Sequence, residues 1–322
     1  MISVVIPNYN AEKYLSDCIE SVLSLKIEKQ IVVVDDGSSD ASLQVLSSYE
    51  KKGLVTVIKQ DNMGAPIARN CGLKSICGDY VLFLDSDDVV YPAAVEKLYN
   101  LCSSEGADIG IGNYLTISQD GGEIAKIDMF TGMETYSREE KWTMIGTIPN
   151  PSNKLYKRDL IVNNNLLWAN VRIGQDLNYF LNAMLHCQKV VTINEYIYGW
   201  RYVPTSISNS VSFKIFDIVE SFKYVKKHYF QQNEYDKYDK YISTIEFKHY
   251  YFQMEKLENI DDTKLKRIIF DFFKYNIEKI DLTRVVNLSE ITKELRNYGI
   301  KKRIKGVYCS NIYPLIMGGK KK

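Results

Sequence analysis

The chain has 322 residues, a formal net charge of +1 and an apolar fraction of 45%. This length suits one large domain or two ordinary ones, and the apolar fraction is sufficient to fill a core. Because positive and negative charges balance, composition gives no reason to expect nucleic acid as a partner.

Cysteine usage indicates neither a zinc site nor a disulfide framework. The six cysteines are scattered without a Cys-x-x-Cys pair, and the three histidines are far apart. The first residues have the pattern of a strand rather than a charged leader with an apolar signal core, and no apolar run reaches membrane-spanning length. We therefore expect a cytoplasmic protein in a reducing compartment.

Apolar strands and amphipathic helices alternate along the first third of the chain. Strands are expected over 2–7, 31–34, 55–58 and 108–113, with a further strand ending at Asp85. Helices are expected after Asn10, from Leu43 onward, and over 65–76 and 93–104. This alternation predicts an α/β fold, with a Rossmann-like, mainly parallel sheet and helices on both of its faces.

The stretch 80–88 is an apolar run that ends in three carboxylates. If the chain stays extended, Asp85 and Asp87 point to one side while Ser86 and Asp88 point to the other. Neighbouring carboxylates repel one another unless a cation lies between them, and oxygen ligands suit Mg²⁺ or Mn²⁺. The alternative is an ordinary acidic turn after a strand.

Three polar clusters directly follow apolar strands. They contain Asn8, Asp35 with Asp36, and the acids that begin at Asp85. Open parallel sheets bind ligands at the carboxyl ends of their strands, so this coincidence favours one shared site. The first turn has neither the Gly-x-Gly-x-x-Gly fingerprint nor a Walker lysine, so a metal on the acids is the expected means of neutralising phosphates.

Four stretches together carry a resemblance to a known family: 3–10, 34–40, 64–70 with Gly72, and 83–88. They resemble the nucleotide-sugar domain of inverting family 2 glycosyltransferases, which have a GT-A type fold. The resemblance implies a donor that is usually a UDP-sugar and a bound Mn²⁺ or Mg²⁺. The positions implied to contact the donor are Pro7, Asn8, Tyr9, Asp35, Asp36, Arg69, Asp85, Ser86 and Asp87, and those implied for the metal are Asp85, Asp87 and Asp88.

The second third of the chain is expected to carry the acceptor side. A loop or edge hairpin is predicted around Gly121, a helix over 136–148, and a returning strand over 153–158. A further helix begins at Asp176, where the family usually has Glu-Asp and this chain has Gln175. The resemblance implies that Asp176 is the general base of a single, inverting displacement on a hydroxyl acceptor. With no neighbouring carboxylate and a helix N-terminus beside it, we expect Asp176 to be ionised.

The chain beyond residue 188 divides into a strand and a helical region. A strand is expected over 190–198, and Arg201 with 206–208 resembles an element that closes over the diphosphate in related transferases. Apolar stripes after residue 211 predict a helical subdomain that packs on the transferase domain or mediates a homodimer. We thus expect a transferase domain over 1–208, with a donor half (1–113) and an acceptor half (114–208), followed by helices over 209–322.

The C-terminal tail and two competing functions complete the expectations. Lysines and arginines flank an apolar stretch over 307–317, which suggests either a solvated tail or peripheral contact with an anionic membrane surface. The leading hypothesis is a metal-dependent transferase that acts on a saccharide or lipid-linked acceptor in cell-surface polysaccharide or glycolipid synthesis. The alternatives are a sugar nucleotidyltransferase and a non-catalytic nucleotide-sugar binding subunit of a synthesis complex.

Overall fold

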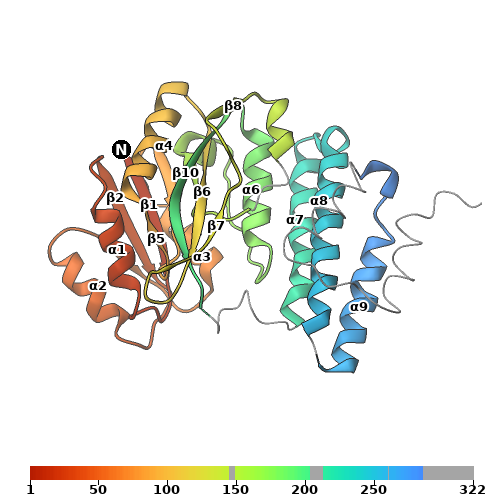
Figure 1. The fold of residues 1–322 in the computed structure, drawn as a ribbon, viewed down its shortest axis with the longest axis horizontal. Helices are drawn as coiled ribbons and strands as arrows, with labels where there is room; N and C mark the ends of the chain where they lie inside the picture. Colours follow the sequence, from red (N-terminus) through yellow and green to blue (C-terminus); the bar gives the residue numbers. More distant parts are fainter. Residues whose placement is uncertain (145–148, 204–212, 260, 286–322) are drawn as a thin grey trace, which may run out of the picture. The chain divides into compact units, whose positions relative to one another are not determined.

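The computed structural model describes residues 1–144, 149–203, 213–259 and 261–285. The chain divides into two compact units, Met1–Ser210 and Val211–Lys322. The first unit is built on a sheet covered by helices, and the second is helical (Figure 1). The domain boundary expected near residue 208, the element over 206–208 and the basic tail lie outside the described residues.

The sheet of the first unit is mixed, and the strands from the first part of the chain form its parallel portion (Figure 1). Its strand order is β3-β2-β1-β4-β9-β6-β10-β5, with β7 paired to β6 and β8 paired to β10. The first four strands run parallel, whereas β9 lies antiparallel between β4 and β6. The strands are β1 (Ile2–Asn8), β2 (Lys29–Asp35), β3 (Thr56–Lys59), β4 (Tyr80–Phe83), β5 (Val89–Val90), β6 (Ile109–Ile117), β7 (Glu123–Ile127), β8 (Glu134–Tyr136), β9 (Lys154–Lys157) and β10 (Val190–Arg201).

Helices cover both faces of this sheet, as the alternating pattern predicts. On one face, the β1 residues Val4 and Ile6 share a buried cluster with residues of α1 (Leu15–Leu23) and α4 (Pro92–Glu105). On the other face, Val34 packs against α3 (Ala65–Leu73), while α6 (Gln175–His186) packs through aromatic rings. The remaining helices of this unit are α2 (Ser42–Glu50) and α5 (Arg158–Asn163). Helices on both faces and a mainly parallel core confirm the predicted fold class.

Side-chain alternation along β1 explains how one strand serves two layers. Val4 and Ile6 face α1 and α4, whereas Val5 faces α3, and all three side chains are fully buried. Strands that are buried on both faces have continuous apolar sequences, which is the pattern seen in β1, β2 and β4. Because β1, β2 and β4 run parallel, their carboxyl ends meet at one edge of the sheet, and the polar clusters follow there.

The helix predicted over 136–148 is wrong. Glu134–Tyr136 forms β8 and pairs with β10, and Glu140–Met144 forms a short 3-10 helix, while residues 145–148 lie outside the described part. Glu140 accepts hydrogen bonds from both the amide and the hydroxyl of Ser137, at 3.0 and 2.8 Å. Sheet pairing takes up Tyr136, and the bonds between Ser137 and Glu140 form a capping box at the start of the short 3-10 helix that stands where an α-helix was predicted.

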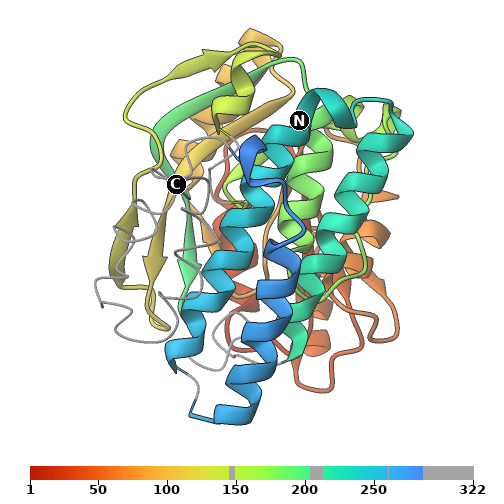
Figure 2. The same ribbon diagram turned by 90° about the vertical axis from the view of Figure 1, so that its right-hand side faces the viewer.

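The second unit is a set of three helices that lie side by side (Figure 2): α7 (Asp217–Gln231), α8 (Tyr235–Glu255) and α9 (Thr263–Ile277). Aromatic rings form its core, since Tyr250 of α8 lies 5.6 Å from Phe222 of α7 and 5.7 Å from Phe273 of α9. Phe222 and Phe273 belong to the apolar stripes that predict helices here. Within the described residues, no helix combines the length and the apolar character needed to span a bilayer.

Close packing of α3 on the sheet predicts that Gly72→Ala destabilises the protein. A Cβ at Gly72 would lie 2.6 Å from Val5 Cγ1, so helix and strand would have to separate. We expect the free energy of unfolding to fall by about 1–3 kcal/mol despite the better helix propensity of alanine. Urea denaturation measures this loss. Gly132→Ala is the control, because a Cβ there has no neighbour within 4 Å, and equal effects of both variants would contradict the packing argument.

Candidate functional site

The ends of β1 and β2 are joined by side-chain hydrogen bonds. Asn8 Nδ2 donates to Asp35 Oδ1 at 2.8 Å and to Ser38 Oγ at 3.2 Å, and both Asn8 and Asp35 are buried. Gly37 has φ +76°, and a Cβ there would lie 3.0 Å from Asn62 N, so this turn requires glycine. The structure thus brings two of the predicted donor residues, Asn8 and Asp35, into direct contact.

Asp36 organises the loop that leads into α3. Its carboxylate accepts hydrogen bonds from Gln60 Nε2 at 2.7 Å, Met63 N at 2.9 Å and Gly64 N at 2.7 Å. Burying this carboxylate is compensated by these three donors. Pro7 is buried within β1, and Tyr9 is exposed just beyond that strand. Roles for Asp36, Pro7 and Tyr9 toward a base or ribose remain predictions.

The acidic residues after β4 form a turn rather than an extended strand. The strand ends at Phe83, and Asp88 N donates to Asp85 O at 3.0 Å, which closes a four-residue turn. Asp88 is buried, and its Oδ1 accepts a hydrogen bond from Arg201 N at 2.8 Å. The expectation that Asp85 and Asp87 point to one side while Ser86 and Asp88 point to the other is wrong in its premise, because the chain is not extended here.

Negative charge accumulates on this acidic turn (residues 85–88). Burial, followed by repulsion from Asp85, raises the pKa of the Asp87 carboxyl to about 6. Burial, followed by the charge of Asp87, raises the pKa of Asp88 well above its usual range. The turn is therefore a place where a cation would relieve electrostatic strain.

Arg69 connects the acidic turn to the start of α6. Its NH2 donates to Asp85 Oδ1 at 2.5 Å, and its NH1 donates to Gln175 Oε1 at 3.1 Å and lies 3.8 Å from Asp176 Oδ1. The residue is 2% exposed, and its guanidinium lies 4.4 Å from the centre of the Trp168 ring. Three residues from distant parts of the sequence thus meet around the Arg69 guanidinium: Asp85, Gln175 and Asp176.

Asp176 is the second residue of α6, after Gly174 with φ +81°. Its Oδ1 is buried and has no hydrogen-bond partner among the described residues, although 38% of the side-chain surface is exposed. Burial raises the pKa of Asp176 to about 6, with a smaller contribution from Asp85, and these outweigh the opposing charges of Arg69 and Lys154. The prediction that the helix N-terminus and a missing neighbouring acid would favour ionisation overlooked this burial. The carboxylate is nevertheless mostly ionised at pH 7.

Aromatic residues beneath the site were not predicted from the sequence. Trp168 stacks on Tyr179 of α6 at 4.3 Å, and Phe83 at the end of β4 lies 5.0 Å from Trp168. Asn70 fixes the backbone of Trp168 twice, as a donor to its carbonyl at 2.9 Å and as an acceptor from its amide at 2.8 Å. Asn70 follows Arg69 in the motif 64–70, which was the only available signal that it has a positioning task.

Lys154 is a second residue near Asp176 that sequence reasoning did not select. It is fully buried in β9 and donates through Nζ to Asn150 O at 2.8 Å and Asn153 Oδ1 at 2.7 Å. Burial lowers the pKa of its ammonium to about 7, while the charge of Asp176 opposes that shift. No spacing or motif distinguishes this lysine from surface lysines of the same chain.

The three acids predicted for the metal do not form a closed metal cage. Throughout residues 1–144, 149–203, 213–259 and 261–285, no group of three or more His, Cys, Asp or Glu residues is placed to hold a metal ion. One oxygen of Asp88 is already bonded to the backbone of β10. Asp85 and Asp87 offer oxygen donors of the kind that Mg²⁺ and Mn²⁺ prefer, and such ions commonly take one or two carboxylates together with substrate phosphates.

Comparison with known proteins places the chain in a family. The model of glycosyl transferase family 2 matches residues 3–163, which contain the ends of β1, β2 and β4 as well as Arg69. The chain belongs to glycosyltransferase family 2. This family assignment agrees with the resemblance of the four motifs, and all four lie inside the matched residues.

Two curated relatives and one solved structure illustrate the similarity. A cholesterol galactosyltransferase of Borreliella burgdorferi is 30% identical over 66% of this chain and 63% of its own length. A poly(ribitol-phosphate) β-glucosyltransferase of Bacillus spizizenii is 32% identical over 61% of this chain, which spans only 31% of that relative. Residues 1–349 of S. aureus TarS, in complex with UDP-GlcNAc, share the fold with a TM-score of 0.72 at 19% identity, covering 92% of this chain and 89% of TarS 1–349.

The raised pKa of Asp176 predicts that Asp176→Asn stabilises this family 2 protein at neutral pH. The folded state holds the proton of Asp176 more tightly than the unfolded chain does. The charged carboxylate therefore lowers the free energy of unfolding, with the full loss present above about pH 6 and none left toward pH 4. We therefore expect the variant to raise Tm at pH 8 and to lose that advantage at pH 4. Asp159→Asn, in the first turn of α5 and exposed, is the control. A Tm gain that is the same at both pH values would contradict the burial argument.

Proposed function

We propose that this protein transfers a sugar from a nucleotide donor, usually a UDP-sugar, to a hydroxyl of a saccharide or lipid-linked acceptor. The observation that carries the proposal is the position of Arg69, which joins Asp85 of the acidic turn to Asp176 at the start of α6. One donor-side acid and a carboxylate whose Oδ1 accepts no hydrogen bond from the described residues thus lie around one guanidinium. Membership in glycosyltransferase family 2 supports the same reaction.

Asp176 is the proposed general base of this transfer. Its buried Oδ1 accepts no hydrogen bond from the described residues, so it is able to accept the proton of an acceptor hydroxyl. A pKa of about 6 is high enough for proton transfer and low enough for the base to be ionised at neutral pH. The hydroxyl then attacks the anomeric carbon opposite the nucleotide, and the configuration inverts in one displacement.

The acidic turn is the proposed place for a divalent cation. Asp85 and Asp87 would hold Mn²⁺ or Mg²⁺ together with oxygens of the donor diphosphate, because the turn supplies oxygen donors and an excess of negative charge. When bound, the ion supplies positive charge that stabilises the departing nucleoside diphosphate. Asp88 serves the turn through its hydrogen bond from β10.

The biological setting that we propose is cell-surface polysaccharide or glycolipid synthesis. Relatives named for cholesterol and poly(ribitol-phosphate) acceptors support this setting, although they are longer than the matched region. The TarS complex with UDP-GlcNAc supports a UDP-sugar donor. The donor sugar is to be identified by screening UDP-sugars.

Release of UDP tests the transferase function directly. With Mn²⁺ and UDP-glucose, UDP-galactose or UDP-GlcNAc, we expect acceptor-dependent UDP release that Asp176→Asn reduces by about 10²–10⁴-fold through loss of the base. The rate should rise with pH up to about pH 6 and then level off, since the base must lose its proton. NMR of the product should show an inverted anomeric centre. Donor binding without release, with acceptors present, would contradict transfer and favour a binding subunit.

Removal of one carboxylate from the acidic turn tests the metal proposal. We expect Asp87→Asn to weaken UDP binding by roughly tenfold when Mn²⁺ is present, because a charged ligand of the ion is lost. In EDTA, the variant and the parent protein should bind UDP alike. Isothermal titration calorimetry measures both conditions, with Asp159→Asn as the control. Equal affinities of parent and variant in Mn²⁺ would remove Asp87 from the metal site.

A further inference from the structure

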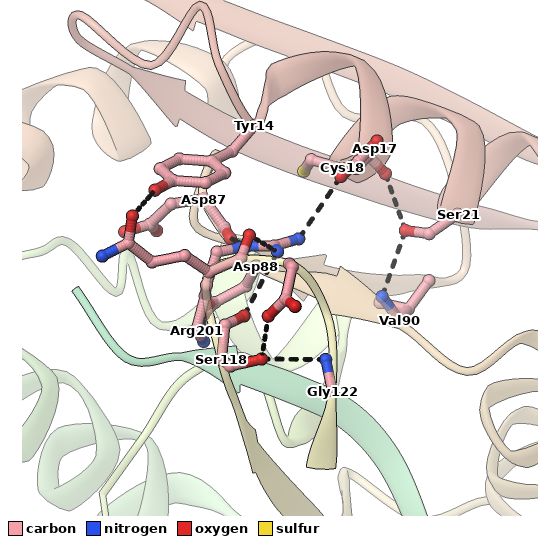
Figure 3. A network of polar contacts seen from close by, with 12 residues as sticks. Tyr14, Asp17, Cys18, Ser21, Asp87, Asp88, Val90, Ser118, Gly122 and Arg201 are labelled. Atoms are coloured by element: carbon pink, nitrogen blue, oxygen red, sulfur yellow. Dashed lines mark hydrogen bonds and ion pairs between the residues drawn. The ribbon is translucent and has the colours of Figure 1, made fainter. Parts of the chain in front are cut away.

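Arg201 lies at the end of β10 and gathers contacts from three separate segments (Figure 3). Its Nε donates to Asp87 O at 2.7 Å, and its NH1 donates to Gln119 O at 2.7 Å. Its NH2 lies 3.6 Å from Asp17 Oδ2 of α1, and its backbone N donates to Asp88. The side chain is 2% exposed, so this arginine is buried at the junction of the acidic turn, α1 and the hairpin between β6 and β7.

The tip of the β6–β7 hairpin (residues 118–122) is tied to the same place by a second set of contacts. Gln119 Oε1 accepts hydrogen bonds from Lys13 Nζ and from Tyr14 OH, each at 3.0 Å. The Tyr14 ring also lies 4.9 Å from the Arg201 guanidinium. The hairpin tip therefore contacts the start of α1 directly and the acidic turn through Arg201.

Arginine is well suited to this junction. Its planar guanidinium presents several donors in fixed directions, so it can serve carbonyl oxygens of two segments at once. A lysine ammonium is a point charge on a flexible stem and would satisfy one of them at a time. The sequence resemblance suggested that Arg201 belongs to an element that closes over the diphosphate, but Nε, NH1 and NH2 each face a group of the protein itself.

We infer that Arg201 is a positioning residue that joins the acidic turn and the hairpin tip into one rigid unit. Through Asp87 O and Asp88 it fixes the backbone of the turn, and through Gln119 O it fixes the hairpin beside it. For the donor, the inference rests on the proposed function: a turn held in this way keeps Asp87 ready for a metal–diphosphate ligand. These contacts of Arg201 with the acidic turn and the hairpin tip, called the tie below, are present in the protein without any ligand.

Hydrogen exchange of the ligand-free protein tests this tie. In Arg201→Lys we expect backbone amides of residues 86–90 and 118–122 to exchange on the order of tenfold faster, since local opening becomes easier. Arg158→Lys is the matched control, because Arg158 also donates to a backbone carbonyl, that of Cys77, but away from the turn. Asp17→Asn should leave exchange nearly unchanged, since that ion pair is long and Asp17 is exposed.

The affinity for UDP in Mn²⁺ is the second measurement, and we expect Arg201→Lys to lower it on the order of tenfold. If affinity falls while exchange of the free protein is unchanged, Arg201 contacts the diphosphate directly and the positioning role is overturned. Faster exchange with unchanged affinity would also overturn it, because the tie would not serve the donor. If the parent protein does not bind UDP, the proposed function fails, whereas the exchange data still decide whether the tie exists.

A milder variant covers the case in which Arg201→Lys does not fold. Gln119→Ala removes the contacts to Lys13 and Tyr14 but leaves the carbonyl that Arg201 bonds. We expect faster exchange at residues 118–122 and a smaller loss of UDP affinity than for Arg201→Lys. Unchanged exchange at the hairpin tip in Gln119→Ala would contradict the tie to α1.

Discussion

The contact of Arg69 with Asp85 and Asp176 is the constraint on which the proposed site depends. A buried guanidinium is costly unless its charge is matched, and here Asp85 and Gln175 accept hydrogen bonds, Asp176 lies 3.8 Å away and the Trp168 ring lies against the guanidinium. Because Arg69 belongs to α3 while its partners come from the acidic turn, the segment before α6 and the first turn of α6, their meeting requires these parts of the chain to be correctly assembled. The site is thus a product of tertiary structure, although each of its parts follows an ordinary strand or precedes an ordinary helix.

The electrostatics of the site follow from its incomplete neutralisation. Arg69 lies between the carboxylates of Asp85 and Asp176, and Arg201 contacts the backbone of the turn, yet the pKa values of both Asp87 and Asp176 remain raised to about 6. Burial is the largest cause in each case. Carboxyl groups with such shifted pKa values gather at functional sites, which favours a task that needs negative charge at this edge of the sheet.

The sequence predicted the sheet and the strand-end acids because apolar runs and their polar ends are local patterns. It could not predict the turn at 85–88, since an extended and a folded Asp-Ser-Asp-Asp look alike without the hydrogen bond from Arg201 N. The shift at Asp176 was missed for the same reason, because burial of a side chain depends on the tertiary structure and not on its neighbours in the sequence. The helix expected over 136–148 shows the converse case: local periodicity was present, yet Tyr136 pairs with β10 and residues Glu140–Met144 form a 3-10 helix.

The antiparallel strand β9 has a consequence for how the chain acquires its structure during synthesis. It pairs with β4 on one side and β6 on the other, yet it follows both of them in the sequence. Until residue 157 has left the ribosome, the two inner edges of the sheet have no partner, and aggregation through them is the main hazard. The parallel strands that end at β4 and the strands around β6 therefore join into one sheet only when β9 is inserted between them.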